Sequence, residues 1–109
     1  MTKFVATQNK GFGITFQNGF TISVQWGTFN YCEKKNLGAD IDEEMKTRRW
    51  ESSNAEIAVI DKEGEMLGIA EHDQVIGWLS PDKVSKIMSV VSSSTTKNEI
   101  ERKIKSLNL

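Results

Sequence analysis

The chain is poor in the residues on which export signals and most enzyme signatures depend. Its 109 residues include one cysteine, one histidine and one proline. A single cysteine, Cys32, excludes an intramolecular disulfide, and the opening residues 1–4 lack the apolar core of a signal peptide. No apolar run approaches the roughly 20 residues that span a bilayer. We therefore expect a cytoplasmic protein without a membrane segment.

The chain also has no large excess of positive or negative charge. The chain carries 14 basic and 15 acidic residues, for a formal net charge of -1. Such a balance produces no field that would attract nucleic acid or an anionic membrane, so neither is an expected partner. A chain of this length is one domain by the usual prior and buries roughly 65% of its unfolded surface without disulfides or metal.

The most informative segment is 11–32, where apolar residues alternate on both sides of an Asn18-Gly19 pair. A two-residue loop would set the apolar face of one strand opposite the polar face of the other. A three-residue loop, 17–19, instead pairs Phe16 with Phe20 and places Gly19 at a left-handed position. The pattern therefore predicts a hairpin with this longer loop, followed by Trp26 at the strand exit.

Further strands are indicated on both sides of this hairpin. Alternation at 55–60 and 65–70 around the turn 61–64 predicts a second hairpin, and 74–79 predicts one more strand. Residues 4–7 are β-prone and are a further candidate. Between the hairpins, residues 27–53 are polar and charged, with a helical turn or two expected at about 42–50.

Two helices are predicted after the last strand. Ser80-Pro81-Asp82 is a typical helix start, and the apolar residues that follow recur at helical spacing over 81–91. A second helix begins at Thr96, with Glu99 completing a capping box. We thus expect an α+β fold: an antiparallel sheet of about five strands, from two hairpins plus a further strand, with the first of two C-terminal helices packed on it.

Residues 1–92 are expected to form the α+β domain. The final helix, within 93–109, follows a Ser/Thr-rich hinge. Because a helix this short is marginal alone in water, it must dock on its own domain or on another copy of the chain. We expect a homo-oligomer, and the sequence leaves open which of the two surfaces the helix uses.

Few residues suit catalysis. His72, between Glu71 and Asp73 in a predicted turn, is more typical of an exposed polar residue than of a general base. Cys32 has no basic neighbour to lower its pKa and is more typical of a structural thiol. The acidic run 40–44 lacks the alternating ligands and closing Glu of a calcium loop. No catalytic residue, metal or cofactor is therefore expected, and a non-enzymatic role is favoured.

What remains is an aromatic and polar set beside the charged loop. Aromatic faces stack on planar ligands, and guanidinium groups bind phosphate in bidentate fashion. Core packing is the commoner role of Trp in a small domain and is favoured for Trp26 and Trp78, whereas for the Arg49-Trp50 pair packing and binding are about equally favoured. The candidate ligand-binding residues are Trp26, Asn30, Tyr31, Arg48, Arg49 and Trp50.

Three blocks of the sequence carry a resemblance. Residues 16–27, Phe-Gln-Asn-Gly-Phe-Thr-Ile-Ser-Val-Gln-Trp-Gly, followed by Asn30-Tyr31-Cys32, resemble a motif that recurs in small uncharacterised proteins of bacteriophages and their bacterial hosts. Residues 54–58 and 75–81 resemble its other two blocks. The resemblance spans about 11–91 and implies a phage or prophage origin, an α+β domain and no assigned catalytic residue.

Small phage proteins often act by binding. We expect a non-enzymatic protein that sequesters a small phosphate-bearing, nucleotide-like signal in the host cytoplasm and so counteracts host defence. The alternative is a protein-interaction inhibitor of a host enzyme, acting through the C-terminal helix or the charged loop. A small nucleotide hydrolase is disfavoured by the single His and the missing metal cluster.

Overall fold

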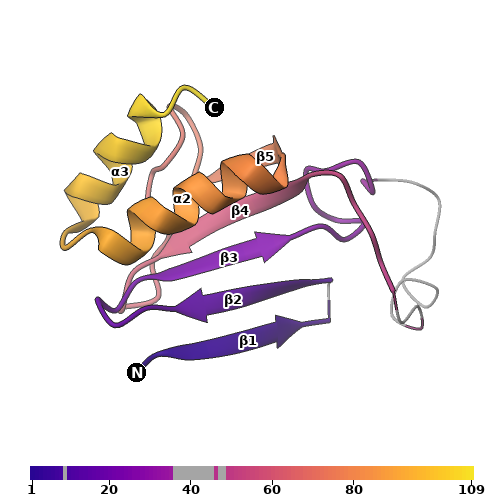
Figure 1. The fold of residues 1–109 in the computed structure, drawn as a ribbon, viewed down its shortest axis with the longest axis horizontal. Helices are drawn as coiled ribbons and strands as arrows, with labels where there is room; N and C mark the ends of the chain where they lie inside the picture. The colour runs from indigo at the N-terminus through magenta and orange to yellow at the C-terminus, as the bar shows by residue number, and fades with distance from the viewer. Residues whose placement is uncertain (9, 36–45, 47–48) are drawn as a thin grey trace.

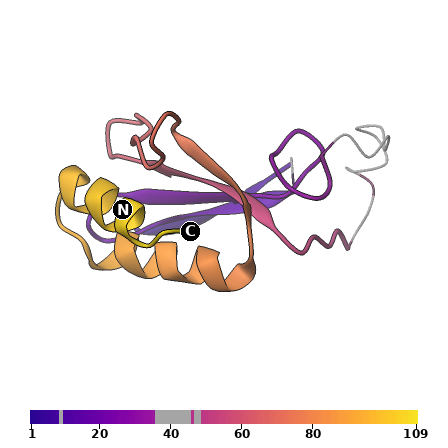
Figure 2. The same ribbon diagram turned by 90° about the horizontal axis from the view of Figure 1, so that it is seen from above.

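A computed structural model describes residues 1–8, 10–35, 46 and 49–109. Five antiparallel strands lie in the order β1-β2-β3-β4-β5 (Figure 1). Helix α2 crosses one face of this sheet, and α3 lies beside α2 (Figures 1 and 2). The fold is therefore the expected α+β arrangement. The bounds are β1 Lys3–Thr7, β2 Gly11–Thr15, β3 Thr21–Gln25, β4 Ala55–Ile60, β5 Val75–Leu79, α2 Pro81–Ser93 and α3 Lys97–Ser106.

The β2–β3 hairpin has the register predicted from its alternation. Ile14 pairs with Ile22 within the ladder. At its end the Phe16 N–H donates to the Phe20 carbonyl at 2.9 Å, so the connection is the three-residue loop 17–19. Gly19 has a φ of +91°, the left-handed conformation that this loop requires. The prediction of loop length and register is confirmed.

The second expected hairpin is only half present. Its turn forms, with Gly64 at a φ of +87° and the Asp61 N–H bonded to the Glu65 carbonyl at 2.8 Å. The prediction of a strand over 65–70 is wrong, because only an isolated bridge joins Ile60 to Met66. Residues 67 and 69 are buried in the core instead, and β5 pairs with β4. The sheet still has five strands, because β1 forms the edge opposite β5.

Local signals place both helices. The Ser80 hydroxyl accepts the Lys83 N–H at 3.3 Å at the start of α2, directly before Pro81. α3 begins after Thr96, as its start signal predicts. The side chains of Ile100 and Ile104 are 0% and 2% exposed and belong to the same core as α2 and the sheet. The apolar stripe of α3 is thus occupied within its own chain.

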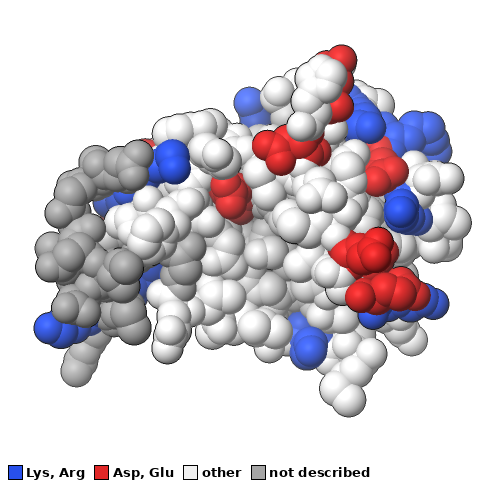
Figure 3. Space-filling view, turned by 180° about the vertical axis from the view of Figure 1, so that it is seen from behind, with Lys and Arg blue, Asp and Glu red and all other residues white. Residues whose placement is uncertain are grey.

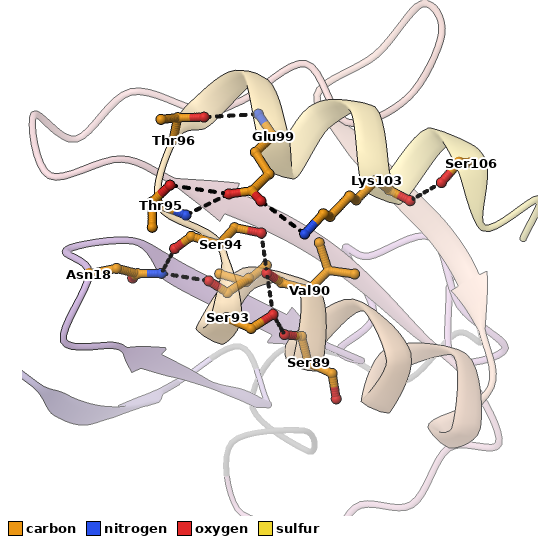
Figure 4. Close-up of polar contacts among 11 residues, drawn as sticks. Asn18, Ser89, Val90, Ser93, Ser94, Thr95, Thr96, Glu99, Lys103 and Ser106 are labelled. Carbon is orange, nitrogen blue, oxygen red and sulfur yellow. Dashed lines mark hydrogen bonds and ion pairs between the residues drawn. The ribbon is translucent and has the colours of Figure 1, made fainter.

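The segment between the helices is held by a network of hydrogen bonds (Figure 4). The Asn18 side-chain amide donates to the carbonyls of Val91 and Ser94 at 2.7 and 2.8 Å, so the β2–β3 turn satisfies the C-terminal end of α2. On the other side of the hinge, the Glu99 carboxylate accepts the Thr95 N–H at 2.7 Å. The hinge is thereby tied to both the sheet and α3.

Glu99 differs slightly from the expected capping box. The Thr96 hydroxyl accepts the Glu99 N–H at 3.2 Å, as predicted, but the carboxylate reaches the preceding residue, Thr95, rather than the N–H of Thr96. It also meets Lys103 at 2.9 Å. The bond from the Thr95 N–H, followed by that from Lys103, lowers the pKa of Glu99 from its ordinary 4.5 to about 2.

Candidate ligand-binding site

Trp26 and Trp50 hold each other in place. The indole N–H of Trp26 donates to the Trp50 carbonyl at 3.0 Å, and the indole N–H of Trp50 donates to the Trp26 carbonyl at the same distance. Trp26 also meets Phe12 edge to face, with ring centres 6.0 Å apart. Both tryptophans are candidate site residues from the sequence alone. The structure brings them together through these two hydrogen bonds, which also stabilise the fold.

Asn30 is committed to the shape of the loop after β3. It is 7% exposed; its side-chain oxygen accepts the Gly27 N–H at 2.9 Å, and its amide donates to Glu56 at 3.1 Å. Glu56 also accepts the Tyr31 N–H at 3.1 Å. The Tyr31 ring is 46% exposed, with the Lys35 ammonium 4.7 Å from its centre. Of these two predicted residues, Tyr31 offers a surface to a ligand.

The chain on either side of residues 36–48 is joined at its base. The Glu33 N–H donates to the Asn54 side-chain oxygen at 2.7 Å, and the Ser53 N–H donates to the Glu33 carboxylate at 2.9 Å. The Ser53 hydroxyl and N–H together lower the pKa of Glu33. Lys34 lies beside this junction, its ammonium 5.4 Å from the centre of the Trp50 ring.

Of the two candidate arginines, Arg48 and Arg49, only Arg49 lies within the described residues. Arg48 and the acidic run 40–44 lie outside the described residues, as does most of the helical turn expected at about 42–50. Arg49 is described: its side chain is 87% exposed and forms an ion pair with Glu51. Among the described cations, Lys34 lies over the Trp50 ring and Arg49 directly precedes Trp50 in the chain.

An apolar cavity of about 310 Å³ opens beside Trp26. Its floor includes Phe12 and Trp26 from the sheet side, and α2 contributes Met88 and Ser85. Asn54, just after the junction with Glu33, also lines it. The sequence does not single out Phe12 or Met88, because both lie in apolar stripes that are equally typical of a closed core. The cavity exists because α2 crosses the sheet at β3 to β5 and leaves Phe12 only partly buried.

A second feature is a group of exposed aromatic side chains. Phe29, Tyr31 and Trp78 are 64%, 46% and 57% exposed. Trp78 has a φ of +58°, an uncommon conformation for a bulky residue, and its N–H donates to the Tyr31 carbonyl at 2.8 Å. Gly77 lies so close that a β-carbon there would come within 2.4 Å of the Tyr31 β-carbon. The loop after β3 therefore packs directly along β5.

The surroundings of Cys32 and His72 do not favour a catalytic role. Cys32 is 0% exposed and its thiol donates to the Gly27 carbonyl at 3.5 Å; burial raises its pKa, which disfavours the thiolate. The His72 side chain is 90% exposed and lies 3.9 Å from Glu71. The part of the chain that is described contains no group of three or more His, Cys, Asp or Glu side chains placed to hold a metal ion.

The charged side chains of the described residues are spread over the surface. On the face turned away from α2, white predominates over the middle and blue side chains lie mostly round the rim (Figure 3). Where this face shows described residues, it has no broad basic surface of the kind that binds a phosphate backbone. Within the described ranges, no helix has the length and apolar character needed to cross a membrane.

Comparison of the chain with protein-family models, with curated proteins and with solved structures finds no match. The features of this chain that bear on function are therefore the cavity, the tryptophan pair and the exposed aromatic side chains.

Proposed function

We propose that this protein is a non-enzymatic binding protein that sequesters a small phosphate-bearing, nucleotide-like molecule. The observation that carries the proposal is the apolar cavity beside Trp26, whose indole N–H is fixed by a hydrogen bond to the Trp50 carbonyl. A binding site of this kind needs a rigid aromatic wall and a few polar groups at its edge. The cavity has both, because Asn54 and Ser85 line it together with Phe12 and Trp26.

Size and charge favour a compact planar group. A volume of about 310 Å³ is at the lower end of the roughly 300–1,000 Å³ typical of small-molecule pockets, so it suits one ring system rather than an extended ligand. Arg49 and Lys34 flank Trp50, and their charges suit a phosphate attached to such a ring. In this proposal the ring enters the cavity and the phosphate stays at the exposed rim.

The biological role follows from the resemblance to phage proteins together with this site. A protein that holds a nucleotide signal without converting it lowers the free concentration of that signal. In the cytoplasm of an infected bacterium, such a protein would counteract a defence that depends on the signal. This role is part of the proposal and rests on the resemblance of residues 16–27 with 30–32, 54–58 and 75–81.

The test is a thermal-shift screen with a panel of mono-, di- and cyclic nucleotides, followed by calorimetry. Ser85→Trp fills the cavity from an exposed position of α2 and should abolish binding. Ser89→Trp, one turn further along the same helix and also exposed, is the matched control and should bind normally. Arg49→Ala should weaken binding about tenfold. Equal affinity of the Ser85→Trp variant and wild type would overturn the proposed site.

A second candidate is a protein-interaction inhibitor of a host enzyme. The exposed group Phe29, Tyr31 and Trp78 favours it, since aromatic side chains are enriched at protein interfaces. The stripe of α3 is buried, so the surface we propose for this role is the aromatic end beside the charged loop. Native mass spectrometry of protein purified from the producing cells separates the candidates. A stoichiometric small molecule supports the first, and a bound protein lost on Trp78→Ala supports the second.

A further inference from the structure

The two edge strands of the sheet, β1 and β5, differ in how far other parts of the chain cover them. At the β5 edge, the register shifts between Ala55 and Ile57 of its partner strand, and the Trp78 N–H is already satisfied by the Tyr31 carbonyl. Irregularity and coverage of this kind protect an edge against pairing with another strand. The loop after β3 thus occupies the β5 edge at Gly77 and Trp78.

The β1 edge carries no such protection in the described residues. β1 is regular over Lys3–Thr7, contains no proline, and has Lys3 as its one charged residue. Phe4 is 84% exposed on one side of the strand and Val5 is 39% exposed on the other. A regular edge with exposed apolar side chains on both faces is a template for pairing with another strand.

Phe4 also extends the apolar face that α2 covers. The registers place Phe4 opposite Ile14, Ile14 opposite Ile22, and Ile22 opposite Val59, so all four lie on one face. α2 packs over β3, β4 and β5 (Figure 1). The apolar face therefore continues past the helix to the β1 edge, where nothing among the described residues covers Phe4.

We propose that β1 pairs antiparallel with β1 of a second copy of this chain, which joins the two sheets into one. A two-fold axis perpendicular to the sheet keeps each face on its own side, so only residues of the same face can be opposed. The register centred on Val5 satisfies this rule and pairs all five residues of β1. It sets Phe4 opposite Ala6 of the partner subunit.

The same register also keeps the like charges of the two strands apart. Lys3 lies opposite Thr7 of the partner subunit, so the one cation of each strand avoids its symmetry mate, and no charge is buried unpaired. A pairing of one five-residue strand buries less than the roughly 1,600 Å² of a standard stable interface. The dimer should therefore be reversible, with a dissociation constant in the micromolar range.

Sedimentation velocity over a concentration series of the full chain tests the proposal. Wild type should shift from monomer to dimer, and Val5→Lys should raise the dissociation constant at least tenfold. Trp78→Lys, at an exposed position on the opposite edge strand, is the control for the added charge and should dimerise as wild type does. Circular dichroism confirms that each variant is folded.

Cross-linking tests the register itself. Val5→Cys should form an intermolecular disulfide under mild oxidation, because Val5 faces Val5 of the partner subunit. Phe4→Cys, which faces a different residue of the partner subunit, should cross-link less; Cys32 is buried in both variants. A wild type that stays monomeric at hundreds of micromolar, or a Val5→Lys variant that dimerises normally, would overturn the proposal and leave the edge to another occupant.

Discussion

Trp26 and Trp50, 24 residues apart in the sequence, exchange two hydrogen bonds of the same kind, each from an indole N–H to the other's carbonyl at 3.0 Å. This exchange closes the base of the long connection between β3 and β4. It also holds the Trp26 ring beside the cavity. For the binding role that we propose, a preformed wall lowers the ordering cost.

Trp50→Phe should destabilise the fold by about 1–2 kcal/mol, because it removes one donor and leaves the partly buried Trp26 carbonyl without it. The double variant Trp26→Phe/Trp50→Phe should cost less than the sum of the two single changes, since the residues act as a pair. Urea unfolding of the four proteins measures the coupling. Strict additivity would show that the two bonds are independent.

Asn18→Ala should destabilise the protein by about 1–3 kcal/mol, because two carbonyls at the end of α2 lose their donor. Asn18→Asp should cost at least as much, since its oxygens would face those carbonyls. Gln17→Ala, next to it in the same loop and exposed, is the control and should change stability by less than about 0.5 kcal/mol. If Asn18→Ala behaved like Gln17→Ala, the contact would be unimportant for stability.

Gly77→Ala should be strongly destabilising, by about 1–3 kcal/mol, because its β-carbon would meet Tyr31 at 2.4 Å and force the backbone apart. Gly68→Ala is the comparison, since its β-carbon would have an ordinary contact of 3.6 Å with Glu101. Thermal melting of the two variants distinguishes them. An unchanged melting temperature for Gly77→Ala would mean that the loop after β3 does not pack against β5 in solution.

Glu99 should contribute to the dependence of stability on acid. Its pKa is lower in the folded protein than its ordinary value, so the carboxylate form stabilises the fold. The contribution is fully present above about pH 4.5 and is lost as the pH falls toward 2. The stability difference between wild type and Glu99→Gln, measured by urea unfolding, should therefore shrink over that range.

Lys103→Ala separates the two partners of Glu99. It removes the ion pair but leaves the bond from the Thr95 N–H, which is the larger cause of the lowered pKa. Most of the acid dependence should survive in this variant. Its complete loss would assign the effect to Lys103 instead.

The candidate site was only partly predictable. Trp26, Tyr31, Arg49 and Trp50 are candidates because of their aromatic or basic residue types. Residue type alone does not distinguish a ring that binds a ligand from a ring that packs in the fold. Asn30 illustrates the limit, because it is buried and its side chain bonds to Gly27 and Glu56 of its own chain. Phe12 and Met88 became cavity residues only through the position of α2 on the sheet.

The sequence alone predicts those features that depend on interactions between residues close together in the chain. Two-residue periodicity and loop geometry specify the pairing of Ile14 with Ile22, and the caps at Ser80 and Thr96 start the helices within a few residues. Residues 65–70 have a strand pattern, yet tertiary packing decided their conformation: the Leu67 side chain is buried in the core, and Glu101 of α3 accepts the Gly68 N–H. The same long-range packing decided where the cavity opens and which edge of the sheet the described residues leave uncovered, because both depend on contacts between residues far apart in the chain.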